Sequence, residues 1–314
     1  MVSAICLPGC NQDESNGTKP SGGSTVSSAD VTDTAKPTTK IAFRETALSA
    51  GVNFTYRNGI EAAELTILES LGGGIALWDY DLDGNVDLFI PGGGGFPAEN
   101  TITGNPSAMF RNLGPAQFSR VTDPAGLHTA SRYSHGAIVA DYDNDGFPDL
   151  LVTGFGGLML FHNQGDGTFE NESEAAGLTD KLWSTSAGWG DINNDGALDL
   201  YIVHYVDWSF ENNPSCGAQL AGKDDICPPR EFEPLPDVCY LGNGDGTFRD
   251  ASQELGLRQD GKGLGVVLAD VDLNGHTDIY VTNDTTANFL YLNSGNGGLR
   301  EEGLESGTAV DNRG

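Results

Sequence analysis

Basic residues are scarce in this sequence. Sixteen lysines and arginines stand against 45 aspartates and glutamates in 314 residues, and the formal net charge is −29 at pH 7. A surface with this charge repels nucleic acid and anionic lipid headgroups, because both carry negatively charged phosphates. We therefore expect no nucleic-acid partner and no direct binding to an anionic membrane surface.

Long apolar runs and paired cysteine motifs are also missing. No stretch reaches the roughly 18 consecutive apolar residues of a membrane-spanning helix. The five cysteines form no CxxC pair and no Cys/His spacing typical of a zinc site. They fall in two groups, Cys6 and Cys10 near the start and Cys216, Cys227 and Cys239 late in the chain.

Motifs that carry catalysis are missing as well. The histidines are scattered without an HExxH pattern, and no nucleophile elbow is present. Glycine-rich stretches at 92–95 and 261–263 lack the residues that complete a phosphate-binding loop. We expect His162 and His204, which fall in or beside strands, to pack there. No catalytic residue and no organic-cofactor site is predicted, and the chain is not expected to be an enzyme.

One acidic stretch, in contrast, occurs four times. It begins at Asp79, Asp141, Asp191 and Asp270, and glycine always occupies its sixth place. Oxygen-bearing side chains at places 1, 3, 5 and 9 match the first nine places of an EF-hand calcium loop. Carboxylates held this close repel each other until a divalent cation binds between them. The pattern therefore predicts about four structural calcium ions, and acidic turns without an ion are the alternative.

The predicted ligands are the side chains at places 1, 3, 5 and 9 and the backbone carbonyl at place 7. In chain order they are Asp79, Asp81, Asp83, Asn85, Asp87, Asp141, Asp143, Asp145, Phe147, Asp149, Asp191, Asn193, Asp195, Ala197, Asp199, Asp270, Asp272, Asn274, His276 and Asp278. A true EF-hand also needs glutamate at place 12 and flanking helices. Place 12 here is isoleucine or valine inside a short β-rich run, so we expect these loops to join β-strands.

A second repeat runs in phase with the first. An aromatic residue or leucine is followed eight residues later by glycine, at Phe43/Gly51, Phe118/Gly126, Phe169/Gly177, Phe248/Gly256 and Leu299/Gly307. Most copies follow a hairpin signal. Asp166-Gly167, Asp245-Gly246 and Asn296-Gly297 suit type I′ turns, which need positive φ. We interpret Asp166 and Asp245 as turn residues, although they could also be read as extra ligands.

One repeat therefore reads as four strands, at 136–140, 149–153, 158–162 and 168–171. Four-stranded antiparallel units repeated around an axis form a β-propeller, so the predicted fold is all-β with the acidic loops between the first two strands of each blade. Strand alternation puts these loops on one face. The insertions 52–72, 91–108 and 204–238 fall on the other, which we expect to bind a ligand.

The stretches LGGGIALWDYDLDG at 71–84 and GDGTF at 165–169 resemble FG-GAP/VCBS repeats. These are the calcium-loop blades of integrin α-chains and of bacterial secreted proteins related to cartilage acidic protein, the ASPIC/UnbV group. The resemblance covers residues 43–314 and implies a propeller that usually has seven blades. The register of the repeats places the next acidic loop beyond Gly314, which favours a fragment of a longer propeller. The alternative is a closed ring of four blades in which a strand at Phe43 pairs with the last blade.

Two cysteine assignments follow from resemblance. Cys216 and Cys227 resemble a pair in related secreted propellers, and a disulfide there would restrict the insertion 204–238. Cys239 is an alternative partner, although we expect it to pack as a small apolar residue. Residues 1–10 resemble the end of a bacterial lipoprotein signal in which Cys10 is lipidated; the match is either the remnant of a truncated signal or accidental.

The chain is accordingly divided into a signal remnant (1–10), a disordered Ser/Thr/Gly-rich tether (11–40) and a propeller (41–314). We expect an extracellular or cell-envelope scaffold for binding or adhesion, free or anchored by a lipid, with a protein or glycan as ligand. Phe96, Trp208, Phe210 and Phe232 are candidate contacts on the insertion face unless they pack their own loops. The rival interpretations are the propeller domain of a polysaccharide-active enzyme or oxidoreductase, and a spacer in a larger surface protein.

Overall fold

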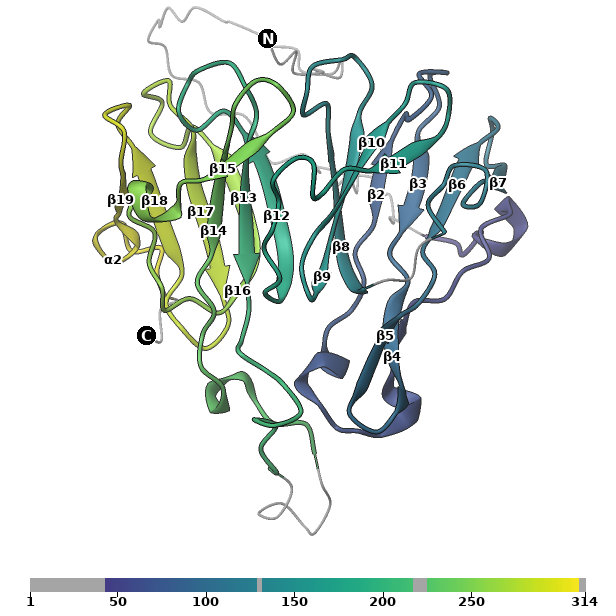
Figure 1. The fold of residues 1–314 in the computed structure, drawn as a ribbon, viewed down its shortest axis with the longest axis horizontal. Coiled ribbons are helices and arrows are strands. Elements are labelled where there is room, and N and C mark those ends of the chain that lie inside the picture. The colour runs from purple at the N-terminus through teal and green to yellow at the C-terminus, as the bar shows by residue number, and fades with distance from the viewer. Residues whose placement is uncertain (1–42, 129–131, 217–224, 311–314) are drawn as a thin grey trace, which may run out of the picture. The chain divides into compact units, whose positions relative to one another are not determined.

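The computed structural model describes residues 43–128, 132–216 and 225–310 (Figure 1). The chain divides into two units, Met1–Glu45 and Thr46–Gly314, and every strand of the described residues belongs to the second. The predicted signal remnant, the tether and the lipidated Cys10 lie outside the described residues. Within the described part of the chain, no helix is both long and apolar enough to cross a membrane.

Four sheets repeat along the second unit, and each contains four antiparallel strands that neighbour one another in chain order. Blade 1 has β2 (Ala76–Trp78), β3 (Asp87–Ile90), β6 (Ala108–Asn112) and β7 (Phe118–Arg120); blade 2 has β8 (Tyr133–Ala140), β9 (Asp149–Phe155), β10 (Met159–Asn163) and β11 (Phe169–Asn171); blade 3 has β12 (Ser184–Gly190), β13 (Asp199–His204), β14 (Val238–Gly242) and β15 (Phe248–Asp250); blade 4 has β16 (Gly263–Ala269), β17 (Asp278–Asn283), β18 (Phe289–Asn293) and β19 (Leu299–Glu301). The predicted all-β propeller of four-stranded antiparallel blades is confirmed.

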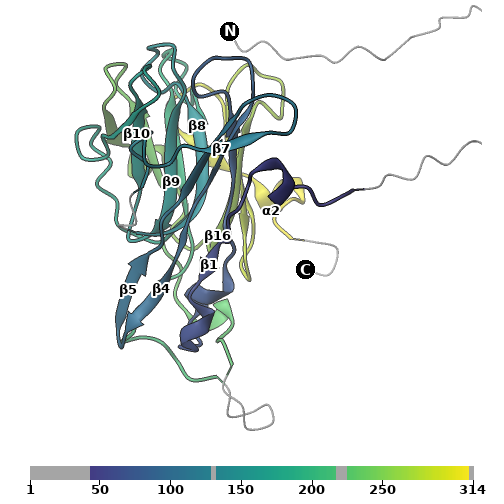
Figure 2. The ribbon, with the colours of Figure 1, turned by 90° about the vertical axis from the view of Figure 1, so that its right-hand side faces the viewer.

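A smaller sheet is added by two of the insertions. It consists of β1 (Arg57–Asn58), β4 (Gly93–Ala98) and β5 (Thr101–Gly104), with β1 parallel to β4. The helices are single turns: η1 (Leu48–Ala50), η2 (Ile60–Ala62), η3 (Ile67–Ser70), η5 (Pro229–Glu231), α1 (Ser252–Leu255) and α2 (Gly303–Ser306). In Figure 1 and Figure 2, β4, β5 and the segments 205–216 and 225–237 extend from the same end of the blades.

The core lies between the faces of successive blades. In β9, the alternation of side chains sends Leu150 and Val152 into a cluster shared with blade 1, and Leu151 into one shared with blade 3. A third cluster joins blades 3 and 4. Because both faces of the middle strands are covered, these strands read as continuous apolar runs.

Two glycines of the second repeat, Gly126 and Gly177, lie against the following blade. Gly126 has φ +76°, and a Cβ placed there would lie 2.8 Å from the carbonyl oxygen of Phe169 in the following blade. The Phe169 N–H donates to the carbonyl of Ala125 at 2.9 Å, and Phe248 repeats this bond to Ala176. Glycine is therefore needed here for both its backbone conformation and its lack of a side chain.

Two local expectations are wrong. Phe43 is exposed and outside any strand, because a fourth blade strand needs the third strand of its own blade as a partner and this segment has none. It therefore does not close a four-blade ring. The Asp166-Gly167 turn is not type I′, since positive φ occurs at Gly165 and Gly167 instead. The bond from Gln164 N–H to the Thr168 carbonyl encloses a longer loop than the two residues of a type I′ turn.

The insertions share one apolar cluster. Ile67 and Leu68 from 52–72, Phe96 and Ile102 from 91–108, and Trp208 and Phe232 from 204–238 pack with Tyr133 and Trp183 of the blades. Trp208 and Phe232 are buried, and Phe96 and Phe210 are partly buried beside them. The alternative, that these aromatics pack their own loops, therefore holds for Trp208 and Phe232, whereas a ligand contact of the partly buried Phe96 and Phe210 stays a prediction.

His204, at the end of β13, forms a buried pair with Asp180. Its Nε2 lies 2.8 Å from Asp180 Oδ2, and its Nδ1 lies 2.6 Å from the Pro236 carbonyl. Burial lowers the pKa of His204, but the hydrogen bond and charge of Asp180 outweigh this and raise it overall. Burial likewise raises the pKa of Asp180, and its bond to His204 brings it below the usual value. The expectation that His204 packs is confirmed.

The contact between blades at Gly126 can be measured by substitution. We expect Gly126→Ala to lower the free energy of unfolding by roughly 1–3 kcal/mol more than Gly256→Ala, because overpacking is added to backbone strain. Gly256 is the matched control, since its φ is +75° and a Cβ there would meet nothing within 4 Å. Urea unfolding measures the free energy of unfolding of both variants. Equal decreases would show that the close approach to Phe169 does not destabilise Gly126→Ala.

The His204–Asp180 pair predicts a pH dependence of stability. A raised histidine pKa stabilises the fold fully below about pH 6.5, and this contribution is lost as pH rises through the folded value. A lowered aspartate pKa stabilises above about pH 3.9 and is lost as pH falls through the folded value. His204→Gln should therefore cost on the order of 3 kcal/mol between about pH 4 and 6.5, and less at pH 9.

Urea unfolding of wild type and variant at pH 5.5 and pH 9 checks this prediction. Exposed His128 supplies the control, His128→Gln, which should change stability little at either pH. A cost of His204→Gln that is the same at both pH values would contradict the charged pair.

Candidate metal-binding loops

Each acidic repeat forms the connection between the first two strands of a blade. We call these connections loop 1 (79–87), loop 2 (141–149), loop 3 (191–199) and loop 4 (270–278). All four have the same backbone, with positive φ at place 4 and at the glycine of place 6. Place 4 is Leu82, Asn144, Asn194 or Leu273, and the prediction that the loops join β-strands is confirmed.

Backbone N–H groups orient the carboxylate at place 1 in the same way in every loop. In loop 1, Asp79 accepts from the N–H groups of Asp83 at 3.0 Å and Gly84 at 2.8 Å. Asp141, Asp191 and Asp270 repeat both bonds. The place-7 residues donate their N–H to the place-5 side chain, which closes the turn. The loops are thus held in shape by their own side chains.

The aspartate at place 9 is the buried member of each loop. Asp87, Asp149, Asp199 and Asp278 are at most 1% exposed. One carboxylate oxygen accepts from the place-2 N–H, and the other accepts from the N–H at the end of the third strand, at 2.7–2.9 Å. Burial raises the pKa of Asp87 to about 6 and that of Asp149 to about 7.

Carboxylates converge in three of the loops. Oxygens of the side chains at places 1, 3 and 9 lie within 4.8 Å of one another in loops 1, 2 and 4. In loop 3, Asn193 replaces the carboxylate at place 3 and its amide donates to Asp195 at 2.8 Å. Asp81 Oδ1 is buried without a hydrogen-bond partner. An all-oxygen donor set with an unpartnered carboxylate oxygen fits a hard divalent cation.

Two basic side chains near the loops were not predicted from the sequence. Arg111 Nη2 lies 2.7 Å from Asp81 Oδ2 and 3.0 Å from Asp83 Oδ2 of loop 1. His162 Nδ1 lies 3.1 Å from Asp149 Oδ1 and 3.5 Å from Asp143 Oδ2 of loop 2. His162 belongs to β10 as expected, but its ring faces the loop. The available signal was the Arg-Asn and His-Asn dipeptides that end the two third strands.

Asparagine side chains connect loops of successive blades. Asn163, at the end of β10, donates to the Tyr80 carbonyl of loop 1 at 2.8 Å. Asn293, at the end of β18, donates to the Ile192 carbonyl of loop 3 at 2.6 Å. Gly242 occupies the equivalent place in β14 by strand register. Loop 1 is therefore bonded to blade 2 and loop 3 to blade 4, whereas Gly242 offers no such side chain between blades 2 and 3.

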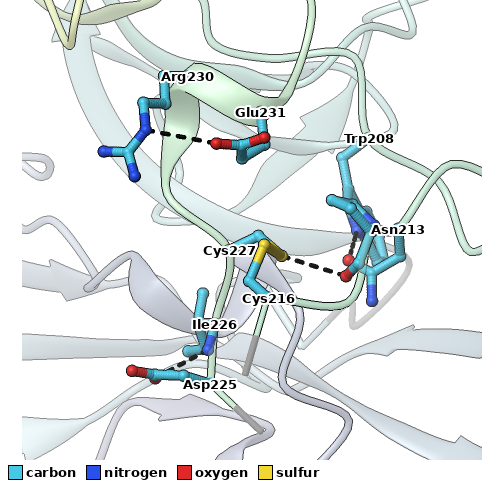
Figure 3. The surroundings of a disulfide bond; sticks show 9 residues. Trp208, Asn213, Cys216, Asp225, Ile226, Cys227, Arg230 and Glu231 are labelled. Atoms are coloured by element: carbon cyan, nitrogen blue, oxygen red, sulfur yellow. Dashed lines mark hydrogen bonds and ion pairs between the residues drawn. A yellow bond between two sulfur atoms is a disulfide. The ribbon is translucent and has the colours of Figure 1, made fainter. Parts of the chain in front are cut away.

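The opposite face carries the disulfide. Cys216 and Cys227 are joined with a Cα separation of 5.2 Å, and Cys239 is free and buried in the core. Figure 3 shows Trp208 and Asn213 beside the bridge, with the indole N–H donating to the Asn213 oxygen at 2.9 Å. The bridge thus ties the insertion 204–238 at the edge of the insertion cluster.

Comparisons with known proteins find relatives that match most of this chain. Cartilage acidic protein 1 of Mus musculus is 23% identical over 247 residues, 74% of this chain and 35% of its own length. The Homo sapiens protein is 22% identical over 247 residues, 74% of this chain and 34% of its own. The chain thus spans about a third of these relatives.

Among solved structures, an Agrocybe aegerita lectin that recognises non-reducing terminal N-acetylglucosamine aligns with a TM-score of 0.37 and 20% identity, over 72% of this chain and 50% of the lectin. The model of the FG-GAP-like repeat matches residues 79–152, 141–202 and 236–281, which include all four acidic loops in whole or in part. Because these matches cover more than half of the residues, the chain belongs to the FG-GAP-like repeat family.

Proposed function

We propose that this protein is an extracellular, calcium-stabilised scaffold that binds a ligand through its insertion face, without catalysis. The observation that carries the proposal is the repeated place-9 aspartate, buried in all four loops and hydrogen-bonded to the third strand. A cation bound at the loop would offset the repulsion among the carboxylates. It would also hold the third strand through this aspartate.

Calcium is the cation that this donor set favours. It accepts six to eight oxygen ligands in flexible geometry, whereas magnesium demands a near-ideal octahedron and keeps several waters. Extracellular modules with such loops bind calcium at about 10⁻⁴ to 10⁻³ M. The disulfide between Cys216 and Cys227 supports export, because such bonds persist in oxidising compartments.

We place the ligand surface on the insertion face because the insertions there are held together by their own contacts. The insertions share a buried aromatic cluster and a disulfide, so they form a pre-organised platform rather than separate loops. Glu61, Glu64, Glu99 and Glu211 are exposed at its tips. The charge of these tips favours an extracellular protein with a basic surface, or a neutral glycan, over an acidic polysaccharide.

Calcium should raise the melting temperature of the protein, and a chelator should lower it. At a free calcium concentration one hundred times the dissociation constant, each site contributes about 2.7 kcal/mol to the free energy of unfolding. Asp149→Asn should remove the contribution of loop 2 to this calcium-dependent free energy of unfolding. The matched control is Asp166→Asn, the same chemical change on the same face, at an exposed turn residue that accepts only from Thr168 in the described structure.

Differential scanning calorimetry in calcium, magnesium and chelator measures these shifts. Asp166→Asn should keep the whole calcium-dependent increment. A wild-type melting temperature that does not respond to calcium, or responds equally to magnesium, would overturn the assignment of the ion.

Charge reversal at the platform tests the binding role. The double variant Glu99→Lys and Glu211→Lys should reduce adhesion of immobilised protein to basic proteins of the extracellular matrix by about tenfold, because the tips set charge complementarity. Exposed Glu174, on a blade edge, gives the control Glu174→Lys. Equal adhesion by the platform variant and this control would place the ligand elsewhere.

A further inference from the structure

The four loops differ at one position that lies outside the repeated acidic stretch. Strand register aligns Arg111 of blade 1 with His162, Leu241 and Leu292, since their partners in the fourth strands are Ser119, Glu170, Arg249 and Arg300. This position is the penultimate residue of the third strand. Loop 1 therefore contacts a permanent cation from a position that is leucine in blades 3 and 4.

Arg111 contacts the carboxylates that a metal ion would use. Its Nη2 lies 2.7 Å from the Asp81 oxygen at place 3 and 3.0 Å from the Asp83 oxygen at place 5. These two side chains are 15% and 27% exposed, so the ion pairs are partly shielded from water. A divalent cation that uses these two oxygens at loop 1 displaces the guanidinium from them.

The contact does not satisfy the whole loop. Asp81 Oδ1 and Arg111 Nε are both buried without a hydrogen-bond partner. Guanidinium binds carboxylates well when it forms two parallel bonds to one group, and here one nitrogen is shared between two groups. Arg111 thus partly neutralises the carboxylates of loop 1 when no metal ion is bound. The loop can still bind a metal ion.

We propose that Arg111 is a tethered competitor of the calcium ion at loop 1, which stabilises the metal-free loop and weakens calcium binding there. The proposal rests on the calcium-loop function proposed above. The proposal gives the four sites unequal calcium affinities although the backbones of the loops are alike. Loop 1 then binds calcium less tightly than its four aspartates would otherwise allow.

The proposal predicts opposite effects of one substitution in two conditions. Arg111→Leu, which installs the residue of blade 4, should lower the melting temperature in chelator, because four carboxylates lose their counter-ion. In calcium it should raise the affinity of one site roughly tenfold, because the ion no longer displaces two ion pairs. A purely structural arginine would lower stability in both conditions and leave affinity unchanged.

Isothermal titration with calcium and calorimetric melting with and without chelator measure these effects. Arg57→Leu is the matched control, since it removes the same charge from an exposed pair with Glu61 on the insertion sheet. The reverse variant, Leu292→Arg, should lower the calcium affinity of one site and raise the melting temperature in chelator. Combining Arg111→Leu with Asp81→Asn should abolish the gain, which assigns it to loop 1.

The outcomes separate the two proposals. If wild-type protein binds calcium but Arg111→Leu behaves as Arg57→Leu in both conditions, the competition is overturned and the calcium function stands. If no variant binds calcium, both fail. A gain of affinity that survives the added Asp81→Asn would also overturn the role of Arg111 at loop 1.

Discussion

Repulsion among inward-facing carboxylates is the constraint on which this structure depends. Each loop turns its place-1 and place-9 side chains inward through backbone N–H bonds, and those bonds orient the oxygens without neutralising them. The pKa of Asp149 is raised mainly because burial makes its charge costly, and repulsion from Asp143 adds to this. The proposed cation would relieve repulsion in a turn whose shape is already formed, so its binding would need little reorganisation of the backbone.

The buried aspartate carries this effect beyond its loop. Asp149 joins loop 2 to the end of β10, and Asn163 at that end reaches the Tyr80 carbonyl in the preceding blade. A cation bound at loop 2 would thus act on its own blade and on the contact with blade 1. Glycines such as Gly126 join the blades in a second row of contacts. Both rows recur because they arise from repeated sequence positions.

Features encoded within one repeat could be predicted from the sequence, and features that join distant segments could not. The alternation in β9 and the acidic loops are local patterns, so strands and loops were found in the right order. The contact of Arg111 with Asp81 depends on the register of β6 against β3, which no spacing reveals. The burial of Trp208 likewise requires three insertions to meet, and each alone looks like an exposed loop. The strand expected at Phe43 was wrong because its repeat signal lacked the partner strand that a hairpin needs.

Different interactions dominate the two faces of the blades. On the loop face, acidic charge would be offset by cations or by Arg111, so it contributes little to attracting a partner. On the insertion face, the buried apolar cluster holds the platform in shape. Among the described residues, Glu61 pairs with Arg57, and the other glutamates at the tips of the platform form no ion pair. The charge that the proposed partner would meet is therefore that of the insertions. Because the platform has its own core, its tips can change sequence without disturbing the loops that hold the blades.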